Sequence, residues 1–177
     1  MSQVKIQDKV FEKFIGNDQI DLAVEKIARE ITRDFGDSTP LFLCVLKGSF
    51  MFAADLFKAY EGPCQISFIQ LSSYKGTTST QEVKTLIGLS EDIKDRDVII
   101  LEDIIDTGIT IAHLLQDLKT YQPRNLKVAS LLVKPAAAKT PVQADYVGME
   151  IPNDFIVGYG LDYDGFGRNL KDIYKII

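Results

Sequence analysis

The sequence has two cysteines, one histidine and no tryptophan. So few cysteines and histidines argue against a disulfide framework and against a zinc site. Cys44 and Cys64 lie in apolar segments and provide no disulfide framework, so we expect a reducing compartment. No cluster of Cys and His has metal-ligand spacing, so a zinc site is not expected. The single histidine, His113, has apolar neighbours in a helical segment, which favours a structural or exposed position.

Long apolar runs and excess positive charge are also missing. No run approaches the roughly 18 residues that a membrane-spanning helix needs, and residues 1–5 lack the apolar stretch of a signal peptide. The net charge of −5 argues against nucleic-acid binding over a broad surface. We therefore expect a cytoplasmic protein that has neither a membrane nor a nucleic acid as its partner. The 177 residues, 46% of them apolar, predict one packed domain over residues 1–177.

Strand and helix patterns alternate along the chain. Apolar residues at helical spacing predict a helix that begins near Asn17 and Asp18, which are suited to cap it. Further helices are predicted at 50–60 and 109–121, and strands at 41–46, 65–71, 98–101, 126–133, 146–147 and 155–157. This order predicts an α/β fold with a mainly parallel, twisted sheet flanked by helices. Such sheets bind ligands at the carboxyl ends of their strands.

Two adjacent acids, Glu102 and Asp103, follow the apolar strand at 98–101 and precede a tight turn into a helix. The amides at that helix start, with the hydroxyls of Thr107 and Thr110, predict a phosphate site. Gly108 would allow the phosphate to approach the backbone closely.

Paired carboxylates beside a phosphate site suit a sugar diol or a hydrated Mg²⁺, so the segment indicates a sugar phosphate as ligand. The alternative is that Asp106 and Thr107 are helix caps and that Glu102 and Asp103 form a solvated turn.

The segment 98–110 resembles the phosphoribosyl-pyrophosphate signature of type I phosphoribosyltransferases: an apolar strand, Glu-Asp, two aliphatic residues, Asp-Thr-Gly and a helix. Blocks at 46–49, 72–74, 128–134, 155–163 and 168–170 are similar to the hypoxanthine-guanine branch. The resemblance runs from about Ile20 to the last residue. It implies the type I fold, with a core at about residues 38–150 and a small hood formed by the terminal segments.

The resemblance implies transfer of hypoxanthine, and of guanine, onto 5-phospho-α-D-ribose 1-diphosphate (PRPP), which yields IMP or GMP and pyrophosphate. It also implies Mg²⁺ as cofactor and a homodimer or homotetramer. Two alternatives stay open: a transferase of another specificity, xanthine above all, and a non-catalytic regulatory protein that binds PRPP. Lys134 argues against adenine, because a lysine has only donors to offer the 6-position.

The same resemblance assigns roles around the purine. It implies that Asp106 exchanges a proton with purine N7 and that Lys134 donates to the 6-oxygen. Phe155 would stack on the base, and Ile156 would present backbone groups to its edge. Asp162 would hold Mg²⁺ through water.

Around PRPP, the resemblance implies that Lys47 and Gly48 form the pyrophosphate loop after a non-proline cis peptide bond, with Arg168 on the other side. The metal-binding acids would be Glu102, Asp103 and Asp162. The full set of expected PRPP contacts is Lys47, Gly48, Glu102, Asp103, Asp106, Thr107, Gly108, Ile109, Thr110 and Arg168.

A polar stretch without periodicity covers residues 72–82, a length that in a compact domain is often functional. The resemblance makes it a lid that begins at Ser73 and Tyr74 and excludes water from the reacting centre. The chain departs from the family pattern at Ile109, at residues 135–138 and at Gly167. None of these positions is the expected proton-transfer residue.

Overall fold

The structure is a computed structural model that describes residues 2–73 and 83–177, except for the side chains of residues 72, 73 and 83–87. Its main sheet has the strand order β5-β4-β3-β6-β7-β8, and all neighbours are parallel except β4 and β5. These strands are β3 (Leu41–Leu46), β4 (Gln65–Ser73), β5 (Val83–Ile87), β6 (Asp97–Ile105), β7 (Asn125–Val133) and β8 (Tyr146–Glu150). The predicted α/β fold with a mainly parallel sheet is confirmed.

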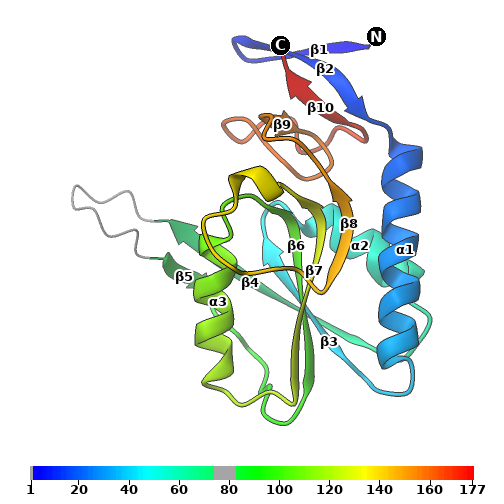
Figure 1. Ribbon diagram of the computed structural model, residues 1–177, viewed down its shortest axis with the longest axis vertical. Helices are drawn as coiled ribbons and strands as arrows, with labels where there is room; N and C mark the ends of the chain where they lie inside the picture. Colours follow the sequence, from blue (N-terminus) through cyan, green and yellow to red (C-terminus); the bar gives the residue numbers. More distant parts are fainter. Residues whose placement is uncertain (1, 74–82) are drawn as a thin grey trace.

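Helices cover both faces of the main sheet (Figure 1). α1 (Asn17–Phe35) and α2 (Phe50–Ala59) pack on one face, and α3 (Ile109–Lys119) packs on the other. In β6, Leu101 joins the core beneath α1 and α2, whereas Ile100 joins the core beneath α3. Because both faces are covered, the central strands are continuous apolar runs rather than alternating patterns.

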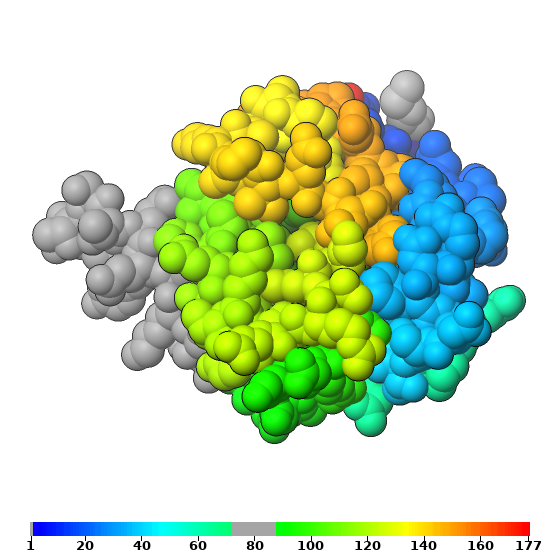
Figure 2. All heavy atoms as spheres, turned by 60° about the horizontal axis from the view of Figure 1, so that its bottom comes forward, coloured from blue at the N-terminus to red at the C-terminus, as the bar shows by residue number. Residues whose placement is uncertain are grey.

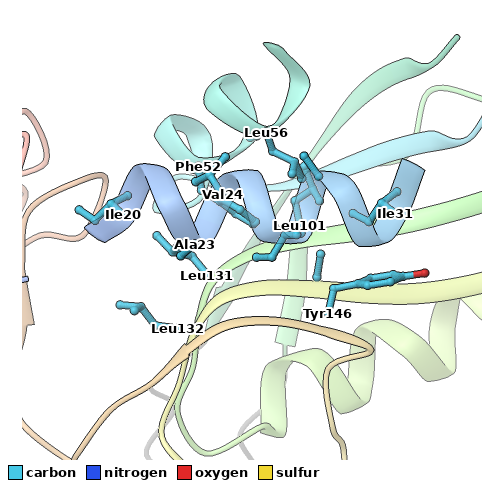
Figure 3. Close-up of a cluster of buried hydrophobic side chains, with 14 of the residues drawn as sticks. Ile20, Ala23, Val24, Ile31, Phe52, Leu56, Leu101, Leu131, Leu132 and Tyr146 are labelled. Carbon is cyan, nitrogen blue, oxygen red and sulfur yellow. The ribbon is translucent and has the colours of Figure 1, made fainter. Parts of the chain in front are cut away.

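The apolar stripe of α1 faces α2 and the sheet (Figure 3). The side chains that meet there are Ile20, Ala23, Val24 and Ile31 of α1, Phe52 and Leu56 of α2, and Leu101, Leu131, Leu132 and Tyr146 of the sheet. All of them are buried, and each large apolar side chain contributes about 1.5–3 kcal/mol by leaving water. The helix predicted from apolar spacing is confirmed, and its burial fixes α1 beside the sheet.

A second, antiparallel sheet lies above the end of the main sheet and carries both termini (Figure 1). Its strands, in the order β1-β2-β10-β9, are β1 (Gln3–Ile6), β2 (Lys9–Ile15), β10 (Ile173–Ile176) and β9 (Ile156–Val157). This sheet is the predicted hood of terminal segments. This sheet pairs strands from opposite ends of the sequence, since Phe11 of β2 lies opposite Ile176 of β10.

The strand that carries the two acids is longer than predicted. β6 runs through Ile105, so Glu102 and Asp103 lie within the strand and not in a turn that follows it. Glu102 pairs with Ser130 of β7 and is buried. The alternative of a solvated turn is therefore wrong, because continued pairing with β7 keeps these residues in the sheet.

Segments between the elements complete the surface. A short 3₁₀ helix, η1 (Pro135–Ala137), follows β7, and in Figure 2 the chain from η1 to β8 (yellow to orange) fills the surface between α3 (green) and α1 (blue). His113 is exposed on α3, and Cys44 and Cys64 are free thiols. None of the helices in the described residues combines the length and hydrophobicity that crossing a bilayer requires.

A buried carboxylate, Asp172, joins the hood to α1. It accepts hydrogen bonds from the backbone amide of Asn17 at 2.8 Å and from Nζ of Lys13 at 3.0 Å. Burial raises the pKa of Asp172, but these hydrogen bonds outweigh burial and leave the pKa below its usual value. The helix begins at Asn17 as predicted, but Asn17 and Asp18 do not cap it. Its N-cap residue is Gly16, and the amide of Asn17 is bonded to an acid 155 residues away along the chain.

Asp172→Asn is expected to lower the free energy of unfolding by about 1–3 kcal/mol, because the amide loses the charge that Lys13 and the first turn of α1 stabilise. Chemical denaturation at pH 7 measures the loss, with Asp37→Asn at an exposed acid as the matched control. The low pKa of Asp172 predicts that the loss shrinks as the pH falls below about 4. Equal stability of the two variants at pH 7 would contradict this role.

Candidate active site

Two adjacent acids stand near the carboxyl end of β6. Glu102 is buried and Asp103 is partly buried, and among the described residues neither forms an ion pair. Asp103 accepts a hydrogen bond from the amide of Ile104 at 2.8 Å. Burial, with repulsion from Asp103, raises the pKa of Glu102 well above its usual value, and burial raises the pKa of Asp103 to about 6. The strand therefore presents two acids with raised pKa values and no ion-pair partner among the described residues.

Two glycines let backbone pack directly against these acids. A Cβ on Gly48 would collide with the Asp103 carboxylate, and a Cβ on Gly160 would collide with the carbonyl oxygen of Gly48. The loop after β3 is thus in contact with Asp103, and the segment that contains Gly160 packs on that loop. The peptide bond between Leu46 and Lys47 in this loop is cis, as the family resemblance implied.

The turn between β6 and α3 leaves the amino end of the helix accessible. Gly108 has a φ of 77°, in the left-handed region that favours glycine, and it caps α3. Oγ1 of Thr107 accepts a hydrogen bond from the amide of Ile109 at 3.4 Å, and Thr110 is exposed. The first amides of a helix have no carbonyl partner within it, so this end is suited to an anion.

Asp106 and Lys134 face each other at the ends of β6 and β7. Nζ of Lys134 lies 3.1 Å from Oδ2 of Asp106, and the lysine side chain is 7% exposed whereas the aspartate is 48% exposed. The amide of Lys134 donates to the carbonyl oxygen of Ile105 at 2.9 Å, which fixes the lysine beside the turn. The aspartate is therefore held at the opening of the site by a buried cation.

Arg168 and Asp162 form a second ion pair beside the acids. Nη2 of Arg168 lies 2.6 Å from Oδ1 of Asp162, and Nη1 of Arg168 donates to the carbonyl oxygen of Gly160 at 2.6 Å. The amide of Gly165 donates to Oδ2 of Asp162 at 2.6 Å. Arg168 lowers the pKa of Asp103 and Asp162 raises it, so the pair lies close enough to act on the β6 acids. In this structure the Asp162 carboxylate is already held by protein donors.

Phe155, directly before β9, is half exposed and supported by two other rings. Its centroid lies 6.3 Å from that of Phe11 and 5.9 Å from that of Tyr163, the latter in an edge-on arrangement. Ile156, the next residue, is buried and pairs with Lys175 of β10. The aromatic cluster holds Phe155 in place and leaves part of its ring free.

The predicted residues of β6, β7 and the hood thus meet at one end of the main sheet. Of the two expected lid residues, Ser73 is the last residue of β4, and Tyr74 lies outside the described residues. Sequence reasoning missed the packing role of Gly160 and the ring support from Phe11 and Tyr163. Gly160 lies inside the block 155–163 that carried the family resemblance, whereas no local pattern indicates that Phe11 reaches Phe155.

The acids fit a hard divalent cation that also binds substrate oxygens. In the part of the chain that the structure describes, no three His, Cys, Asp or Glu residues converge as a metal-ligand set. Glu102 and Asp103, adjacent and without an ion-pair partner among the described residues, nevertheless match Mg²⁺, which commonly takes one or two carboxylates and fills its other positions with water and phosphate oxygens.

Comparison with known proteins agrees with this geometry. The model of the phosphoribosyl transferase domain family matches residues 16–164. The chain belongs to this family. The resemblance inferred from the segment 98–110 is therefore confirmed, and the end of the sheet that carries Glu102, Asp103 and Asp106 is the candidate site of a phosphoribosyltransferase.

Relatives and solved structures agree on the branch of the family. The chain is 43% identical over 163 residues to the hypoxanthine-guanine phosphoribosyltransferase of Mycobacterium avium (88% of this chain, 80% of the relative) and 39% identical over 160 residues to that of Bacillus subtilis (90% and 89%). A crystal structure of the Bacillus anthracis hypoxanthine-guanine phosphoribosyltransferase superposes with a TM-score of 0.90 at 40% identity and covers 94% of this chain and 98% of its own.

Asp103→Asn is expected to stabilise the substrate-free phosphoribosyltransferase at neutral pH. The pKa of Asp103 in the fold, about 6, lies above its ordinary value of 3.8, so ionisation opposes folding as the pH rises between these values. The gain should be on the order of 2–3 kcal/mol above pH 6 and should vanish below about pH 4. Urea unfolding of both proteins at pH 4 and pH 7 measures it, and a gain that is the same at both pH values would contradict this explanation.

Proposed function

We propose that this protein is a hypoxanthine-guanine phosphoribosyltransferase of purine salvage, which converts hypoxanthine or guanine and PRPP to IMP or GMP and pyrophosphate. The observation that carries the proposal is the position of Asp106, between the amino end of α3 and the buried ammonium of Lys134. An acid placed between a phosphate site and a hydrogen-bond donor can exchange a proton with a base bound there. The names of relatives that are 39–43% identical support the same activity.

PRPP is proposed to bind along the ends of β3, β6 and α3. Its 5′-phosphate meets the amides and hydroxyls of Thr107–Thr110 at the start of α3. Its pyrophosphate lies between the Lys47–Gly48 loop and the guanidinium of Arg168, whose fork of donors suits phosphate oxygens. The Gly48–Gly160 contact keeps these two pyrophosphate-binding segments together.

The acids of β6 are proposed to face the ribose hydroxyls and Mg²⁺. Glu102 and Asp103 would hold the ion with PRPP oxygens, and Asp162 would contribute through water once Arg168 turns to the pyrophosphate. The ion supplies charge neutralisation for the departing pyrophosphate. A cation bound here would also offset the burial that raises the pKa of both acids and the repulsion from Asp103 that raises that of Glu102 in the free protein.

The purine is proposed to stack on Phe155, with its edge against the backbone of Ile156. Lys134 turns from Asp106 and donates to the 6-oxygen. N9 then forms the bond to C1 of the ribose as the bond from C1 to the pyrophosphate oxygen breaks. The proton on N7 passes to Asp106, whose negative charge also stabilises the positive charge that develops on the sugar.

Further proposals concern the surroundings of the site. The segment that begins at Ser73 and Tyr74 acts as the lid that excludes water from the reacting sugar. The protein acts in the cytoplasm as a homodimer or homotetramer.

A panel of bases tests the function. Purified protein with PRPP and Mg²⁺ is given hypoxanthine, guanine, xanthine or adenine, and pyrophosphate release is measured. Release with hypoxanthine and guanine, and little with adenine, is the expected result. Release with xanthine above that with the other bases would assign the xanthine specificity instead, and PRPP binding without release would favour a regulatory protein.

Asp106→Asn is expected to lower kcat by about 10²- to 10⁴-fold, because the amide cannot accept the N7 proton. The KM for PRPP should stay within a few-fold of its value, since the helix start and the β6 acids are unchanged. Steady-state kinetics with both substrates varied separates the two constants. Near-normal kcat in this variant would exclude Asp106 as the proton acceptor.

Lys134→Met is expected to raise the KM for hypoxanthine by about 10- to 100-fold, because the variant keeps the aliphatic stem but loses the donor to the 6-oxygen. It should also reduce the preference for hypoxanthine over adenine. Lys127→Met is the matched control, because Lys127 lies at the other end of β7 and pairs with Asp145 at 2.8 Å. An unchanged KM for hypoxanthine in Lys134→Met would contradict the assigned contact.

A further inference from the structure

The proposed 5′-phosphate site lacks a positive charge of its own. The loop from Asp106 to Thr110 contains no lysine or arginine, and the strand before it adds the acids Glu102 and Asp103. A phosphate monoester carries between one and two negative charges at neutral pH. The amino end of a helix offers about half a unit of positive charge. A cation from another part of the chain would supply the remaining countercharge.

The segment after β7 packs against this loop. The amide of Lys139 donates to the carbonyl oxygen of Thr107 at 2.9 Å. Oγ1 of Thr140 lies against Gly108 so closely that a Cβ on that glycine would collide with it. The Thr140 hydroxyl is buried and has no hydrogen-bond partner among the described residues, so it acts as a spacer behind the loop. Figure 1 shows this segment (yellow) beside the amino end of α3.

Lys139 is the lysine whose backbone is bonded to the phosphate loop. Its side chain is exposed, and no ion pair of Lys139 is found in the described part of the chain. By contrast, Lys134 is paired with Asp106 and Arg168 with Asp162. A flexible four-carbon stem allows the Lys139 ammonium to reach a ligand on the neighbouring turn.

We propose that Lys139 supplies the cation for the 5′-phosphate of PRPP, and that the Thr140 contact with Gly108 holds Lys139 in position to do so. This inference rests on the proposed function. It assigns part of the PRPP affinity to a residue outside the β6–α3 motif. It also places that residue on the same short segment as Lys134, so that one segment contacts both substrates.

Lys139→Ala is expected to raise the KM for PRPP by about three- to tenfold, and to leave kcat and the KM for hypoxanthine within about twofold. Lys139→Arg should restore most of the affinity, because it keeps the charge. The effect of Lys139→Ala should shrink as NaCl rises, since salt screens exposed charges. Lys119→Ala, at the far end of α3, is the matched control.

Isothermal titration with ribose 5-phosphate separates this inference from the proposed function. Weaker binding to Lys139→Ala than to the unmodified protein and to Lys119→Ala would support the role of Lys139, whether or not the protein consumes hypoxanthine. Equal binding to all three proteins would overturn it. A KM for PRPP that rises equally in Lys139→Ala and Lys139→Arg would also overturn it, because charge would then not be the cause.

Discussion

The site depends on two adjacent acids that form no ion pair within the part of the chain that the structure describes. Glu102 and Asp103 are successive residues of a strand, so sheet pairing with β7 prevents them from moving apart. Burial raises the pKa of both acids, and repulsion from Asp103 raises that of Glu102 further, which means that the free protein carries an electrostatic penalty at this point. Under the proposed function, a ligand that brings a divalent cation would remove that penalty, so part of its binding energy would come from relief of repulsion.

The other elements are arranged around this constraint. Gly48 allows the loop after β3 to contact Asp103, and Gly160 allows a second backbone segment to contact Gly48, which larger residues would prevent. The hood places Arg168 above the acids, and Asp172 fixes the hood to the first turn of α1. The packed core under α1 therefore helps to set the position of Arg168, which lies between β9 and β10 of the other sheet.

Sequence patterns predicted the elements whose structure depends on residues that are neighbours in the chain. The apolar stripe of α1, the continuous apolar strands and the turn at Gly108 were predictable, because each depends on neighbours in the chain. The length of β6 was not, since acids at the end of an apolar run are typical of a turn and only pairing with β7 extends the strand through Ile105. The pairing of the hood strands could not be predicted either, because β2 and β10 lie at opposite ends of the sequence.

In the proposed mechanism, the ion pair between Lys134 and Asp106 connects the choice of base with proton transfer. In the free site the buried ammonium has Asp106 as its carboxylate partner, so it remains hydrogen-bonded before a base arrives. A 6-oxopurine offers an acceptor for the lysine and a proton for the aspartate, and thus replaces both sides of the pair at once. Adenine has a 6-amino donor, which would leave a buried charge without an acceptor, and an unsatisfied buried charge is costly. Selection of the base and release of Asp106 for proton transfer are therefore one exchange of hydrogen bonds.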